Sequence, residues 1–210
     1  MSNKEIRSFL GTVESRAADD GKIVLTGMPI VFNQSTDIGG WFEETIDPGA
    51  VDEKILRDVL LLVNHNFEGI PLARSRNNTE NSNLRLRIQD NGVSMEADLD
   101  PKNPKAIELN SAVERGDISG MSFAFFVEED RWERLDSDYP KRTVTRIGDI
   151  IEVSAVNWPA YSGTSIQSER SLESGLESLE RARKELESAR ARSARIADLN
   201  KKLEEINRNE

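Results

Sequence analysis

Apolar and polar residues follow two different regimes along the chain. From the N-terminus to about residue 161, short apolar runs and two-residue alternation predict a strand-rich region with short helices. From about residue 168 to 210, leucines and isoleucines recur every three or four positions among charged residues, which predicts one long helix. Strands mixed with short helices favour an α+β barrel or sandwich over a βαβ sheet.

The strand pattern is clearest around an Asn-Gly pair at positions 91–92. The segments 84–88 and 93–99 alternate between apolar and polar residues on either side of this pair, as in a β-hairpin with a tight turn. Further strands are expected at 22–31, 60–64, 118–127 and 143–156.

Two short helices and a linker complete the predicted outline. Asp47 followed by Pro48 predicts a helix that runs to about residue 57, and an Asn-Pro pair at 103–104 predicts another that runs to about residue 115. Small polar residues at 162–168 predict a linker between the strand-rich region and the long helix.

The long helix has an interrupted apolar stripe. Arg183, Arg190 and Arg192 break the pattern in its middle. Its last apolar residues have the 3-4-3 spacing of a heptad repeat: Ile196, Leu199, Leu203 and Ile206. The helix is therefore either a solvated charged helix or a helix that binds a partner, by coiled coil or groove docking, and the spacing favours a partner.

Charge and composition exclude several classes of function. Residues 167–210 hold 10 acidic and 10 basic residues, so the formal charge of −10 belongs to residues 1–166. An acidic domain argues against binding nucleic acid or anionic membranes. No apolar run is longer than Val59–Val63, which is far shorter than the ~20 residues of a membrane helix. The first residues lack the apolar segment of a signal peptide, and no cysteine is present, so a reducing cytoplasm is expected.

His65 is the one histidine of the chain, which restricts the available chemistry. Without cysteine, a cysteine nucleophile and a zinc site of several His or Cys ligands are excluded, and we expect no metal and no cofactor. An imidazole base would have to be His65, which follows the apolar strand at 60–64. The alternative is that His65 is a surface or capping residue.

A serine nucleophile needs such a base, and the base needs an orienting group. Ser122 lies on an apolar strand and is a candidate nucleophile, although a strand serine is commonly structural. Glu152 interrupts an apolar strand, and if it points inward it requires a partner such as an imidazole. Asp149 competes for this third position. On the pattern alone, Glu152 could equally lie on a solvent face.

Four motifs in register resemble the prohead (capsid maturation) protease family of tailed phages, which is grouped with the herpesvirus assemblin-like serine proteases. The resemblance covers about residues 5–165. The motifs are Phe42-Glu43-Glu44-Thr45-Ile46-Asp47-Pro48-Gly49-Ala50, Leu62-Val63-Asn64-His65, Gly120-Met121-Ser122-Phe123-Ala124-Phe125, and Glu152-Val153-Ser154 leading to Pro159-Ala160-Tyr161.

The resemblance implies a serine endopeptidase with Ser122 as nucleophile and His65 as general base. Glu152 takes the third position, where the herpesvirus relatives have a second histidine, and Asp149 remains the alternative. The implied fold is a small, mostly antiparallel β-barrel flanked by short helices at 1–161, followed by the linker 162–168 and a helical tail at 169–210.

The resemblance also implies a place in virion assembly. Such an enzyme cleaves the scaffold region of the major capsid protein and itself, inside the procapsid in the host cytoplasm, and its tail would dock on scaffold or capsid protein. By analogy with the herpesvirus enzymes a homodimer is expected. The competing hypotheses are a non-enzymatic capsid assembly or scaffolding protein and a serine esterase. The Gly-x-Ser-x-Gly elbow of α/β-hydrolases is absent at Ser122, which disfavours an esterase of that fold.

Overall fold

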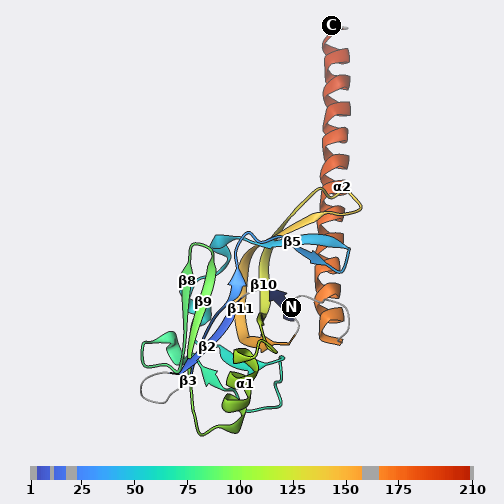
Figure 1. The fold of residues 1–210 in the computed structure, drawn as a ribbon. Coiled ribbons are helices and arrows are strands. Elements are labelled where there is room, and N and C mark those ends of the chain that lie inside the picture. Colours follow the sequence, from blue (N-terminus) through green and yellow to red (C-terminus); the bar gives the residue numbers. More distant parts are fainter. Residues whose placement is uncertain (1–3, 10–11, 18–22, 158–165, 209–210) are drawn as a thin grey trace.

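The computed structural model describes residues 4–9, 12–17, 23–157 and 166–208, which form two β-sheets and a long helix (Figure 1). The larger sheet contains β1 (Lys4–Phe9), β4 (Thr36–Ile38), β5 (Phe42–Ile46), β6 (Leu60–Val63), β7 (Ala73–Arg74), β10 (Gly120–Glu133) and β11 (Lys141–Val156). The smaller sheet contains β2 (Val13–Ala17), β3 (Ile23–Val31), β8 (Leu84–Gln89) and β9 (Gly92–Leu99). The α-helices are α1 (Pro104–Glu114) and α2 (Ile166–Arg208), and short 3₁₀ helices are η1 (Pro48–Ala50), η2 (Glu53–Leu56) and η3 (Arg76–Asn78).

Strand β11 organises the larger sheet. It pairs antiparallel with β10 along most of its length, and β10 pairs antiparallel with β1 at the sheet edge. On its other side β11 pairs in parallel with β5 through residues 141–144 and with β6 through residues 152–155. Strand β11 therefore fixes the relative register of β10, β5 and β6.

The core lies between the two sheets. Buried apolar side chains of β10, such as Phe123 and Phe125, share one cluster with Leu25 of β3 and Met95 of β9. The α+β class is confirmed. The sheets formed by the described residues are not closed into a barrel, so the expected barrel closure is unconfirmed.

Most of the expected local elements are present, and one is wrong. The hairpin around Asn91-Gly92 is the β8–β9 pair, and Asn103 caps α1 by accepting from the Lys105 amide at 3.0 Å. The single helix expected at 47–57 is instead η1 followed by η2. Val51 between them is extended, and Asp52 accepts from the Lys54 amide at 2.7 Å, so it starts a new helix rather than continuing the first.

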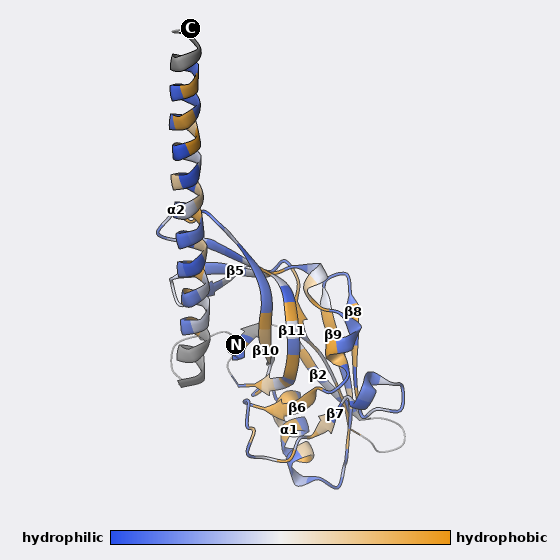
Figure 2. Cartoon of the chain, turned by 180° about the vertical axis from the view of Figure 1, so that it is seen from behind, coloured by the Kyte–Doolittle hydropathy of each residue, from blue (hydrophilic) through white to orange (hydrophobic). Residues whose placement is uncertain are grey.

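Helix α2 has a docked half and a projecting half. Ser178 and Leu179 are buried against the sheet, and a Cβ on Gly175 would lie 2.6 Å from the Phe42 ring, so glycine permits this close approach. Arg183 donates to the backbone carbonyls of residues 135 and 137 in the β10–β11 loop. Beyond this region α2 extends away from both sheets (Figures 1 and 2).

The arginines that interrupt the heptad pattern lie where α2 passes from its docked half to its projecting half. Arg190 forms a bidentate pair with Asp136 at 3.0 and 2.7 Å, as part of the same contact with the β10–β11 loop. The apolar residues that follow are more than half exposed: Ile196, Leu199 and Leu203. None of the helices in the described ranges is both long and apolar enough to span a membrane.

A buried cluster of charges lies where α2 meets the larger sheet. Arg142 of β11 donates to Glu5 of β1 and to Glu44 of β5 at 2.8 and 2.9 Å, and Arg7 of β1 also pairs with both carboxylates, at 2.5 Å each. All four side chains are no more than 5% exposed. Ser174 of α2 donates to Glu5 at 3.1 Å. The cluster joins three strands and the helix.

Mutual neutralisation stabilises the charged forms of Glu44 and Arg142. Burial opposes ionisation of Glu44, but the guanidinium groups of Arg7 and Arg142 outweigh it and lower the pKa of Glu44 below its ordinary 4.5. Burial likewise opposes the charge of Arg142, while Glu5 and Glu44 raise its pKa. Because the pKa of Glu44 is lower when folded, its contribution to stability is present above about pH 4.5 and is lost as the pH falls through the folded value.

Replacing Arg142 by Met should destabilise the fold strongly, because the buried Glu5 and Glu44 would each lose one of their two cationic partners. We expect the free energy of unfolding to fall by about 3–5 kcal/mol in urea denaturation. Arg146→Met is the matched control on the same strand, since Arg146 pairs with Glu128 with both side chains about half exposed, and it should cost less than about 1 kcal/mol. Equal effects of the two substitutions would contradict this account of the cluster.

Candidate active site

His65 lies two residues beyond the end of β6. The apolar run of β6 buries Leu61 and Leu62 between β11 and β7, which fixes the point at which the chain leaves the sheet. Asn64 and His65 then both adopt left-handed backbone conformations, with φ of 50° and 55°. Non-glycine residues are uncommon in this region and are held there by their surroundings. The turn directs the imidazole back over β11.

Glu152 of β11 receives the imidazole. Its Oε1 lies 2.7 Å from His65 Nδ1, and its Oε2 accepts from the Ser154 hydroxyl at 2.5 Å. Glu152 is fully buried, while the His65 side chain is 12% exposed. The inward orientation considered for Glu152 is therefore the observed one. Asp149, the competing carboxylate, is exposed and stands opposite Phe126 in the β10–β11 register, away from Glu152.

Ser122 lies on the neighbouring strand and on the same face. It stands directly opposite Ser154 in the β10–β11 register, and Ala124 stands opposite Glu152. Side chains of residues directly opposite in an antiparallel pair have Cβ atoms about 4.5–5.5 Å apart. Ser122 is buried, and its hydroxyl donates to the Arg7 carbonyl of β1 at 2.8 Å. The fold thus brings Ser122, His65 and Glu152 to one place.

This arrangement suits proton transfer. A carboxylate at Nδ1 favours the tautomer with the proton on Nδ1, because an ionised carboxylate only accepts hydrogen bonds. Nε2 then keeps a lone pair and can act as a base, and the buried negative charge of Glu152 stabilises the imidazolium that forms. Among the described residues no group of three or more His, Asp or Glu side chains is arranged to hold a metal ion.

Two asparagines fix the end of β6. Asn64 donates from its side-chain amide to Asn157 Oδ1 at 3.1 Å, and its own Oδ1 accepts from the Asn157 backbone amide at 3.1 Å. Sequence reasoning placed Asn64 in a motif but assigned no role to Asn64 or Asn157. A signal existed, because asparagine tolerates left-handed backbone and Asn64 directly precedes the lone histidine.

The loop after His65 exposes apolar side chains beside this site. Phe67 is 39% and Ile70 86% exposed, and the Lys4 ammonium lies 4.3 Å from the centre of the Phe67 ring. The other motif residues at 159–161, like most of the expected linker 162–168, lie outside the described residues, so the proposed division into domain, linker and tail stays a prediction.

The chain resembles known proteins over most of its length. Residues 11–178 match the family described as caudovirus prohead serine protease. The chain is 26% identical over 170 residues to the prohead protease of Enterobacteria phage HK97. The alignment covers 79% of this chain and 68% of that protein. Among solved structures, the bacteriophage T4 capsid assembly protease gp21 aligns with a TM-score of 0.47 at 15% identity, over 75% of this chain and 98% of that one. The chain belongs to the caudovirus prohead serine protease family.

Proposed function

We propose that the protein is a phage prohead maturation protease that uses Ser122 as nucleophile, His65 as general base and Glu152 as orienting carboxylate. The observation that carries the proposal is the 2.7 Å contact between Glu152 and the one imidazole of the chain, on the sheet face that also holds Ser122. Membership of the protease family supports the class of reaction.

The proposed reaction is acyl transfer through an ester on Ser122. The hydroxyl proton now points to the Arg7 carbonyl, so it must first turn towards His65 Nε2. Ser122 Oγ then attacks the peptide carbonyl while Nε2 takes the proton, and the same imidazolium returns it to the leaving amine. Water, activated by His65, releases the acid product. Glu152 stabilises the imidazolium in both halves of the cycle.

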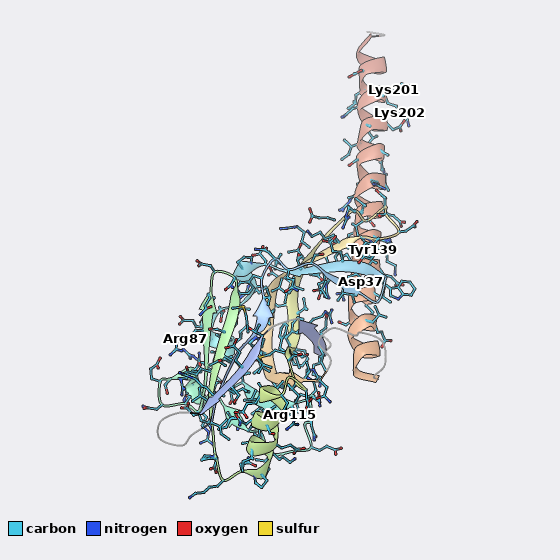
Figure 3. The ribbon with its side chains drawn as sticks, viewed as in Figure 1. Asp37, Arg87, Arg115, Tyr139, Lys201 and Lys202 are labelled. Carbon is cyan, nitrogen blue, oxygen red and sulfur yellow. The ribbon has the colours of Figure 1, made fainter. Side chains whose placement is uncertain are left out.

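The substrates we propose are the scaffold region of the major capsid protein and the chain itself, cut inside the procapsid. A homodimer in solution is part of this proposal by analogy with the herpesvirus enzymes. The projecting half of α2 supports a role in delivery. It carries an exposed apolar stripe, Ile196, Leu199 and Leu203, and Lys201 and Lys202 lie on the same projecting segment (Figure 3).

Ser122→Ala should abolish proteolysis. We expect the native chain, incubated with its capsid protein, to produce discrete fragments that intact-mass spectra follow over time. In the Ser122→Ala variant the rate of cleavage should be lower by roughly 10⁶. Ser94→Ala, in a strand of the other sheet, is the control and should cleave like the native chain. If the native chain leaves the capsid protein and itself whole, the non-enzymatic assembly hypothesis replaces this proposal.

Glu152→Gln should reduce kcat on the order of 10⁴, less than Ser122→Ala, because an amide of the same shape no longer holds the imidazole in the reactive tautomer. Asp149→Asn should leave kcat near the native value, since Asp149 is exposed. Both are measured with a peptide that spans a cleavage site identified in the capsid protein. An inactive Asp149→Asn beside an active Glu152→Gln would place the third member at residue 149.

The apolar stripe is tested separately from the chemistry. We expect Ile196→Ser, Leu199→Ser and Leu203→Ser, combined in the Ser122→Ala background, to prevent packaging into procapsids, measured by immunoblotting of purified particles. The control replaces Ala197, Lys201 and Glu204 by Ser on another face of the same segment and should be packaged normally. Normal packaging of the stripe variant would show that another surface delivers the protein.

A further inference from the structure

A second serine, Ser154, stands at the centre of the site. Its hydroxyl donates to Glu152 Oε2 at 2.5 Å and accepts from the His65 backbone amide at 3.1 Å. The side chain is fully buried and lies directly opposite Ser122. One hydroxyl therefore contacts both the carboxylate and the backbone of the base.

The bond to the His65 amide holds a strained turn. Left-handed backbone at a non-glycine residue is unfavourable and persists only where the surroundings hold it. The Asn64 side chain fixes the first left-handed residue through Asn157, and Ser154 supplies the acceptor for the amide of the second. Without that acceptor, the turn would lose the contact that holds the His65 backbone against β11.

The bond to Glu152 sets the direction of the carboxylate. A carboxylate can rotate about its last bond and offer either oxygen to a donor. Because Ser154 occupies Oε2, Oε1 is left facing His65 Nδ1. Donation to an ionised group is among the stronger hydrogen bonds of proteins, so this orientation is well defined.

We propose that Ser154 is a positioning residue of the protease, which aligns His65 and Glu152 with each other. This inference rests on the proposed function. Ser154 is not assigned as nucleophile, because its proton is given to Glu152, the carboxylate that contacts Nδ1, whereas the proposed base acts through Nε2.

The lone histidine makes the alignment directly observable. With the protein labelled with ¹⁵N-histidine in the Ser122→Ala background, which keeps the chain intact, the proton on His65 Nδ1 should give one signal far downfield. Ser154→Ala should shift this signal upfield or broaden it by exchange with water, and Ser154→Thr, which restores a hydroxyl, should retain it.

Ser75→Ala is the matched control. Ser75 is also fully buried, and its hydroxyl also makes two bonds, from the Val59 amide and to the Leu56 carbonyl, but away from the site. It should lower stability and leave the His65 signal unchanged. An unchanged signal in Ser154→Ala, or equal changes in both variants, would overturn the positioning role.

In the active protein, Ser154→Ala should lower kcat by on the order of 10²-fold with little change in KM, because the base is displaced while the substrate contacts stay. Ser154→Thr should recover most of this loss, and Ser75→Ala should keep the native kcat. If Ser154→Ala is inactive while Ser122→Ala cleaves normally, Ser154 is the nucleophile and the proposed assignment of Ser122 fails. If Ser122→Ala is inactive and Ser154→Ala has the native kcat, the proposed function stands and the positioning role fails.

Discussion

The rest of the structure depends on the buried charge cluster between α2 and the larger sheet. Two arginines and two glutamates are withdrawn from water, and each cation contacts both carboxylates. Such charges are stable only if β1, β5 and β11 keep one relative position, because an unpaired buried ion is very costly. Helix α2 covers the cluster and adds a hydroxyl to it. The backbone of Arg7, a member of the cluster, also accepts the Ser122 hydroxyl, so this packing extends to the candidate nucleophile.

The two faces of β10 have different tasks. One face gives Phe123 and Phe125 to the core between the sheets. The opposite face carries Ser122 and Ala124, which stand opposite Ser154 and Glu152 of β11. The imidazole of His65 contacts Glu152 there. Because side chains alternate along a strand, one segment contributes to the core on one face and to the candidate site on the other. The apolar layer on one side thus supports the candidate site residues on the other.

Sequence patterns predicted the elements whose neighbours lie close along the chain. The β8–β9 hairpin and α1 follow from alternation, turn residues and capping. Strand β1 was not predicted, because three of the four residues Lys4–Arg7 are charged. The burial of Glu5 and Arg7 depends on the distant Arg142 and Glu44 as well as on their own ion pair. The single helix expected at 47–57 was wrong because of a local interaction. Asp52 caps a second short helix there and interrupts the first.

The same distinction applies to the site. The lone histidine and the carboxylate inside an apolar strand were identifiable because each is chemically out of place in its own segment. Ser154 is not, since a small hydroxyl is common in strands, and its importance arises from the two bonds that it makes across the fold. Ser122 is ordinary in sequence for the same reason. Its buried hydroxyl needs a partner at rest, and the Arg7 carbonyl provides one. Under the proposed mechanism, this hydroxyl proton must turn from the Arg7 carbonyl towards His65 before Ser122 can attack a peptide.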